Sequence, residues 1–130
     1  LVTGALRSDY QKTRIEMMCE EIGVKSFSPL WHKKSLSHMK SILNHGFEIK
    51  FISVSCEGLD ASWLGKSLTE DELDKLIHLS NKYRFNLDGE GGEFETITVN
   101  GPHMNKRIIC DGHTEFSSGR GEWIINSVNI

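Results

Sequence analysis

The decapeptide FEIKFISVSC, residues Phe47–Cys56, is the clearest strand in this sequence. It is rich in phenylalanine, isoleucine and valine, which suit a pleated and half-buried backbone. A helical pattern with one apolar side precedes it, from Ser35 to the stop residue Gly46. Another helix is expected after it, where Thr69 and Glu72 have the spacing of a capping box. The centre of the chain therefore predicts alternating helix and strand.

The two ends of the chain carry different patterns. Strands are expected near residues 95–99, 107–111 and 123–130, so the C-terminal tail is rich in β-structure. Residues 1–6 have the pattern of an apolar strand that runs directly into a helix, which Ser8 and Gln11 begin and Gly23 ends. Such a strand is typical of a parallel α/β sheet, where it has neighbours on both sides. We expect those neighbours upstream of this sequence.

Composition narrows the class of protein. The 130 residues are enough for one domain with a core, and 38% hydrophobic and 25% charged residues are ordinary for a globular protein. A net charge of −3 gives no broad basic surface, so direct nucleic-acid binding is not expected. No apolar run approaches the ~18 residues of a membrane span. Cys19, Cys56 and Cys110 form no CxxC pair and indicate reduced thiols in the cytoplasm.

The stretch from Asp88 to Glu95 concentrates negative charge, with four acids in eight residues and no base. Gly89, Gly91 and Gly92 give its backbone unusual freedom. Like charges placed together cost stability unless solvent or a cation compensates them. The stretch is therefore either a solvated acidic turn or a site. If it is a site, its carboxylates could hold Mg²⁺ or meet a cationic organic substrate, and the chemistry alone leaves both open.

Two further segments are candidate sites. Residues 4–16 lie where a strand would meet a helix N-terminus, and the free N–H groups there could bind an anion or simply be capped. Trp63 lies in a turn bounded by Gly58 and Gly65, where an indole either packs in the core or forms a wall for a cation. The six histidines show no zinc-site spacing, and no GxSxG element indicates a catalytic serine.

Four motifs occur in order: GALRSDYQKTRIE (residues 4–16), SPLW (28–31), GLDASWLG (58–65) and GEGGEFET (89–96). Together they resemble the diphthine–ammonia ligase family of the adenine-nucleotide α-hydrolase (PP-loop ATP pyrophosphatase) superfamily. The resemblance covers about residues 1–102, and the last motif is the most specific. The chain departs from the family pattern in one respect, because it contains no SGGxDS phosphate-binding loop.

The resemblance implies an α/β fold in which residues 1–23 are the last strand and helix of a Rossmann-like (HUP-type) ATP domain. Residues 24–130 would then be a C-terminal α+β substrate-binding domain. The implied reaction is the ATP-dependent amidation of diphthine on translation elongation factor 2, with ammonium as nitrogen donor and AMP and pyrophosphate as products. ATP is expected with Mg²⁺, the location is expected to be cytoplasmic, and a homodimer is left open. We expect this polypeptide alone to be inactive, or to be part of a longer protein.

The matching motifs also assign residues. Carboxylates and an aromatic face suit the trimethylammonium group of diphthine, and a carboxylate whose pKa is raised by burial could deprotonate ammonium or the attacking amine. We expect catalytic roles for Glu90, Glu93 and Glu95, and no protein ligands to a metal. Substrate-binding roles are expected for Gly89, Gly91, Gly92, Phe94, Thr96 and Trp63. Roles in lining the ATP or adenylate pocket are expected for Gly4, Ala5, Ser8, Tyr10, Gln11 and Arg14.

Other functions fit the same residues less fully. A related ATP pyrophosphatase could act on another carboxylate or amine, because the fold and the ATP chemistry do not determine the acceptor. A module without enzymatic activity could bind a cationic ligand or a protein partner. An SGGxDS loop upstream in the same reading frame would favour an enzyme over a module.

Overall fold

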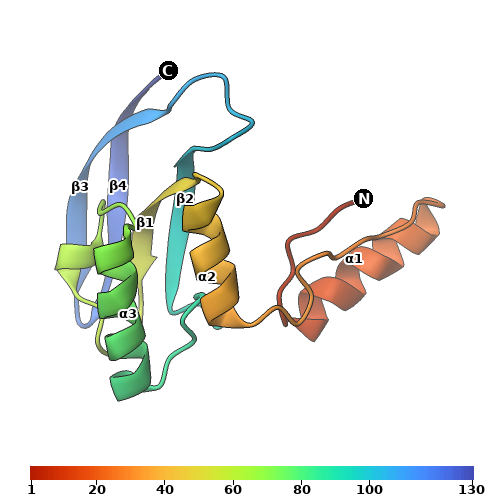
Figure 1. Cartoon of the computed structure of the whole chain (residues 1–130), viewed down its shortest axis with the longest axis horizontal. Helices are drawn as coiled ribbons and strands as arrows, with labels where there is room; N and C mark the ends of the chain where they lie inside the picture. Colours follow the sequence, from red (N-terminus) through yellow and green to blue (C-terminus); the bar gives the residue numbers. More distant parts are fainter.

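A four-stranded antiparallel sheet organises the C-terminal part of the chain (Figure 1). In the computed structural model, which describes residues 1–130, the strands are β1 (Glu48–Val54), β2 (Phe94–Asn100), β3 (Ile109–Ser117) and β4 (Arg120–Asn129). Their order in the sheet is β2-β1-β4-β3, and every neighbouring pair is antiparallel. The strand predicted from the central decapeptide is therefore confirmed as an inner strand, and the three strands predicted for the tail are confirmed as β2, β3 and β4.

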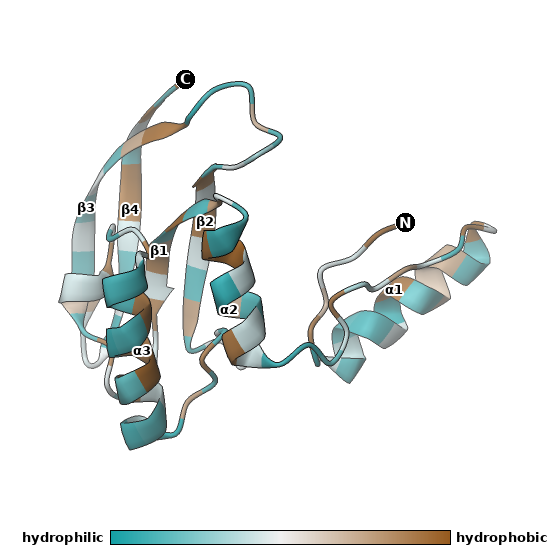
Figure 2. Ribbon diagram, viewed as in Figure 1, coloured by the Kyte–Doolittle hydropathy of each residue, from teal (hydrophilic) through white to brown (hydrophobic).

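Two α-helices cover one face of this sheet, α2 (Ser35–Asn44) and α3 (Glu70–Tyr83) (Figure 1). The helix α3 begins as predicted, because Oγ1 of Thr69 accepts a hydrogen bond from the backbone N–H of Glu72. Figure 2 shows hydrophobic residues along the sides of both helices. A short 3₁₀ helix, η1 (Ala61–Trp63), lies between β1 and α3 in the sequence. None of the three α-helices has the length and apolar character needed to cross a bilayer.

The core lies between the sheet and these helices. Eleven buried residues form one cluster, and all of them fall between Met39 and Phe94 in the sequence. Phe51 of β1 is its centre, with no exposed surface. The rings of Trp63 and Phe94 meet Phe51 edge to face, at centroid distances of 5.1 and 5.2 Å. We call residues 34–130, which contain this core, the body.

Residues 1–33 form an N-terminal arm beside the body (Figure 1). Its helix α1 (Asp9–Glu21) begins as predicted, with Oγ of Ser8 accepting a hydrogen bond from the N–H of Gln11. The helix α1 is largely exposed, since Cys19 is its one buried residue and Met18 is 46% exposed. Figure 2 shows α1 as mostly hydrophilic.

The strand predicted for residues 1–6 was wrong. Val2 forms a single parallel bridge with Phe27, and the rest of the segment has no strand pairing. A strand depends on hydrogen-bonding neighbours, and the described residues supply only the short segment around Phe27. The observed fold is therefore a mixed α/β body with an antiparallel sheet, and no parallel sheet forms within residues 1–130.

Candidate functional site

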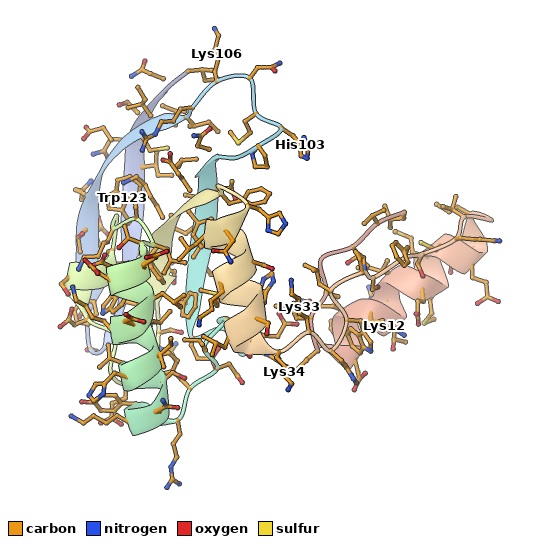
Figure 3. All side chains as sticks on the ribbon, in the orientation of Figure 1. Lys12, Lys33, Lys34, His103, Lys106 and Trp123 are labelled. Atoms are coloured by element: carbon orange, nitrogen blue, oxygen red, sulfur yellow. The ribbon has the colours of Figure 1, made fainter.

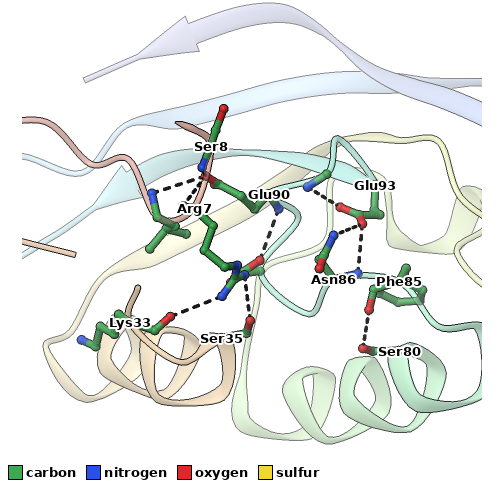
Figure 4. Close-up of polar contacts among 12 residues, drawn as sticks. Arg7, Ser8, Lys33, Ser35, Ser80, Phe85, Asn86, Glu90 and Glu93 are labelled. Atoms are coloured by element: carbon green, nitrogen blue, oxygen red, sulfur yellow. Dashed lines mark hydrogen bonds and ion pairs between the residues drawn. The ribbon is translucent and has the colours of Figure 1, made fainter. Parts of the chain in front are cut away.

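The acidic loop between α3 and β2 is held closed by one of its own glutamates. Oε1 of Glu93 accepts hydrogen bonds from the backbone N–H and the side-chain amide of Asn86, at 3.0 and 2.7 Å. Oε2 of Glu93 accepts from the N–H of Gly91 at 2.8 Å (Figure 4). A side chain at Gly91 would come within 2.6 Å of Oε1 of Glu93, so only glycine fits without a shift. The carboxylate of Glu93 thus shapes the loop.

Glu90 reaches across from this loop to the arm. The backbone N–H groups of Leu6, Arg7 and Ser8 all donate to Oε1 of Glu90, at 3.3, 3.0 and 3.2 Å (Figure 4). Successive amides that converge in this way form an anion-binding concavity, and here it lies just before the N-terminus of α1. The sequence predicted an anion or a cap at this junction. The anion that the structure shows there is the carboxylate of Glu90.

Arg7 makes the second connection between the arm and the body. Its guanidinium forms an ion pair with Asp88, donates to Oγ of Ser35 at 2.9 Å, and donates to the backbone oxygen of Lys33 at 3.4 Å. The side chain of Asp88 has no exposed surface. We call the bonds of Glu90 and Arg7 together the arm–loop tie. In this tie, the guanidinium of Arg7 is a cation that compensates part of the negative charge of the acidic loop.

The ionisation of Asp88 follows from this surrounding. Burial alone would raise the pKa of the Asp88 carboxyl. Hydrogen bonds from Ser35 and Arg7, with the N–H of Glu90 and the charge of Arg7, outweigh burial and hold its pKa below the ordinary value of 3.8. Asp88 is therefore anionic at neutral pH, which matches its pairing with Arg7.

Three members of this site were not predicted from the sequence: Arg7, Asp88 and Ser35. A signal was present for the first two, since Asp88 opens the run of acids and Arg7 is a base inside another motif. Nothing in the sequence pairs them, because 81 positions separate Arg7 from Asp88. The same holds for Glu90 and its three amide partners.

The end of the acidic motif lies on β2, where successive side chains point to opposite faces of the sheet. Phe94 is buried in the core, and Thr96 is on the same side, opposite Phe51 of β1. Glu95 is exposed on the other face and lines a hollow of about 430 Å³ with Glu122 and Trp123. The structure therefore separates Glu95 from Glu90 and Glu93.

The other residues predicted for the site are dispersed. Trp63 is 5% exposed in the core, and Nζ of Lys66 lies 5.5 Å from its ring centre. On α1, Tyr10 and Arg14 are exposed side by side, with the guanidinium 5.8 Å from the phenol ring. The remaining members of the arm set differ in exposure: Ala5 is buried, Ser8 is half-buried, and Gly4 and Gln11 are exposed.

A metal ion or a phosphate could bind at this site only through carboxylates or amides that are not already bonded within the protein. No group of three or more His, Cys, Asp or Glu side chains is arranged to hold a metal ion. The carboxylates of Asp88, Glu90 and Glu93 already accept N–H or guanidinium donors, so they do not fit Mg²⁺ in this arrangement. The amides of residues 6–8 are engaged by Glu90, so they do not fit a nucleotide phosphate either.

The fold and the site define a class of protein: a mixed α/β domain whose acidic glycine loop is bonded to a turn at the start of a helix. The chain belongs to the diphthamide synthase C-terminal domain family, whose model matches residues 34–129. The family resemblance expected from the four motifs is thereby confirmed.

Relatives in several organisms carry one name, diphthine–ammonia ligase. The fission yeast protein from Schizosaccharomyces pombe is 40% identical over 119 residues, which are 90% of this chain and 20% of that protein. The human protein is 37% identical over 109 residues, 83% of this chain and 40% of that protein. The Saccharomyces cerevisiae protein is 34% identical over 116 residues, 76% of this chain and 16% of that protein. The chain thus spans less than half the length of these relatives.

Proposed function

We propose that this chain is the C-terminal part of a diphthine–ammonia ligase. In the whole protein, ATP would activate the carboxylate of diphthine on translation elongation factor 2, releasing pyrophosphate. Ammonia would then displace AMP and leave the amide. Family membership and the shared name of the relatives support this proposal. The reaction requires ATP with Mg²⁺ and places the protein in the cytoplasm with the elongation factor.

The single observation that carries the proposal is the arm–loop tie. It joins the first motif, through Leu6, Arg7 and Ser8, to the last motif, through Glu90. Two segments that the family pattern marks as functional are thereby held in one fixed relation. In this reading Glu90 is a positioning residue that orients the arm, and Glu93 gives the loop its shape.

Contacts with the substrate and the nucleotide require side chains that are not already bonded within the arm–loop tie, so we assign these contacts to other residues. Glu95 is the one glutamate of the motif that the loop does not use, and it lies with Glu122 in a hollow whose lining also includes Ile52, Ile124 and Ile125. Two carboxylates beside apolar side chains suit a trimethylammonium group, which is a permanent cation that cannot donate hydrogen bonds. Tyr10, Gln11 and Arg14 are exposed on α1, on the arm that the tie orients, and we assign them to the nucleotide side of the site.

The test uses the full-length protein with diphthine-bearing elongation factor 2, ATP and ammonium. AMP and amidated elongation factor are the expected products. Glu95→Gln is expected to raise KM for the elongation factor by about threefold, because a surface ion pair contributes up to about 1 kcal/mol. Glu90→Gln is expected to lower kcat instead, because it loosens the arm. Glu57→Gln, an exposed change outside the motif, is the matched control.

Other outcomes would redirect the proposal. AMP formation that depends on a different carboxylate or amine would indicate a related ATP pyrophosphatase. Binding of the elongation factor with no consumption of ATP would indicate a module without enzymatic activity. Unchanged kinetics in both Glu90→Gln and Glu95→Gln would remove these glutamates from the site.

A further inference from the structure

A groove of about 490 Å³ lies between α2 and the edge strand β2, on the helix-covered side of the sheet. His38, Ser41, Ile42 and His45 have the spacing of one helix face, and they form the α2 wall. Thr96 and Thr98 form the β2 wall, where they pair with Phe51 and Ile49 of β1. A volume of this size is typical of a small-molecule site.

One end of the groove is cationic. Lys33, the last residue of the arm, lines this end (Figure 3), and its Nζ donates a hydrogen bond to Oγ of Ser41 at 2.9 Å. Nδ1 of His45 donates a hydrogen bond to the backbone oxygen of Ser41 at 2.7 Å, so Nε2 is left to interact with another partner. No aspartate or glutamate lines the groove.

The neighbouring acids do not cancel this charge. Asp88 and Glu90 act on His38 through space, but each is already bonded within the arm–loop tie. Burial lowers the pKa of His38, and the charge of Lys33 adds to this effect. His38 is therefore mostly neutral at pH 7, and the positive charge of the groove at this pH comes from Lys33.

The remaining wall is apolar. Leu30, Phe47 and Ile49 line it, Phe47 is 37% exposed, and Ile42 on the α2 wall adds to the apolar surface. A bare inorganic anion would leave this surface in contact with water. A ligand with an apolar body would bury it, at about 25 cal/mol per Å². The groove therefore combines a polar surface, which includes the ammonium group of Lys33 and the hydroxyl group of Ser41, with an apolar surface, which includes Leu30, Phe47 and Ile49.

We infer that this groove binds a small molecule that carries a carboxylate or a phosphate on an apolar body. Lys33 supplies the charge, Ser41, Thr96 and Thr98 supply hydroxyl groups, and Ile42 and Phe47 contact the body of the ligand. The site is distinct from the Glu95 hollow, since Thr96 and Glu95 lie on opposite faces of the sheet. The inference holds whatever reaction the whole protein catalyses.

Isothermal titration calorimetry on the full-length protein tests this inference with four probes. Phenyl phosphate and 3-phenylpropionate carry the two anionic groups, phenethylammonium carries a cation on a similar body, and inorganic phosphate lacks the body. Both aromatic anions are expected to bind at least about tenfold more tightly than the other two probes. The tighter of the two anions identifies which acid group the natural ligand carries.

Matched variants locate the binding. Lys33→Met is expected to weaken both aromatic anions by at least about tenfold, while Lys34→Met, at the exposed neighbouring lysine, leaves the dissociation constants unchanged. Thr98→Val keeps the side-chain shape and is expected to weaken them by about threefold, which gives a second readout if Lys33→Met does not fold. Equal effects of Lys33→Met and Lys34→Met, tighter binding of the cation, or no heat with either aromatic anion would overturn the inference.

Discussion

The body and the N-terminal arm are held by different kinds of interaction. Eleven buried apolar residues hold the body together, whereas the arm buries only Ala5, Leu6 and Cys19. The arm is oriented instead by directional bonds. Glu90 of the loop accepts hydrogen bonds from the turn before α1, and Arg7 of the arm pairs with Asp88 of the loop. Apolar burial gives stability without direction, and charged hydrogen bonds give direction with modest stability. The position of the arm can therefore be disturbed while the body stays folded.

The sharpest contrast comes from removing the same side chain in each region. Phe51→Ala opens a cavity at the centre of the body and is expected to lower the free energy of unfolding by about 4 kcal/mol. Phe27→Ala removes a side chain on the arm that is 64% exposed, and about 0.5 kcal/mol or less is expected. Urea denaturation of each variant measures both. Similar losses would show that the arm has a core of its own.

The next effect concerns the ion pair between the regions. Arg7→Ala leaves the buried carboxylate of Asp88 without its cation, and we expect a loss of about 2 kcal/mol, below the range for fully buried pairs because Arg7 is 34% exposed. Amide exchange should accelerate at residues 6–8 and not in the core of β1. Arg14→Ala, at an exposed arginine of the same arm, is the control and should change neither quantity.

Acid should weaken the same connection. Because the folded state holds the pKa of Asp88 below 3.8, its carboxylate adds stability at pH values above 3.8, and this contribution disappears as the pH falls through the folded value. The contribution of this group to the free energy of unfolding is therefore expected to be present at neutral pH and to be lost as the pH is lowered below 3.8. Unfolding free energies measured across this range should fall less steeply in Asp88→Asn. Identical pH profiles would show that Asp88 has no part in the tie.

The smallest expected effect concerns the reactivity of Cys56, which follows β1 and is influenced by Glu93 of the acidic loop. Burial, with a contribution from the charge of Glu93, raises the pKa of the Cys56 thiol to about 11. Its reaction with iodoacetamide at pH 8 should therefore be roughly a hundredfold slower than that of an ordinary thiol. Glu93→Gln should accelerate the reaction by less than about tenfold, and Glu57→Gln, beside Cys56 in the sequence, is the control. A slower reaction in Glu93→Gln would contradict this account of the loop.

Local sequence patterns predicted most of the elements. The capping residues Ser8 and Thr69 begin their helices, and the Phe47–Cys56 pattern contains β1. Residues 1–6 were predicted wrongly because an apolar pattern does not supply the partner strands that a sheet needs. The strand β3 is longer than its apolar pattern, since pairing with β4 extends it through polar residues as far as Ser117.

The site was predictable in its chemistry and not in its partners. The run of acids indicated either a solvated turn or a site with a cation nearby, and Arg7 is a cation that pairs with the first of these acids, Asp88. Its identity depends on the fold bringing residue 7 to residue 88, which no local pattern contains. The glutamates of the motif looked equivalent in the sequence, but the alternation of β2 directs Glu95 to the other face while Glu90 and Glu93 stay in the loop.

Glu90 holds the arm through three backbone amides. Hydrogen exchange resolved at the N–H groups of Leu6, Arg7 and Ser8 tests it most directly, in the wild type, in Glu90→Gln and in the exposed control Glu57→Gln. We predict that Glu90→Gln accelerates exchange at all three amides by about tenfold, since hydrogen bonds to a charged group contribute about 1.5–3 kcal/mol, while the control does not. Unchanged protection of these three amides in Glu90→Gln would contradict the claim.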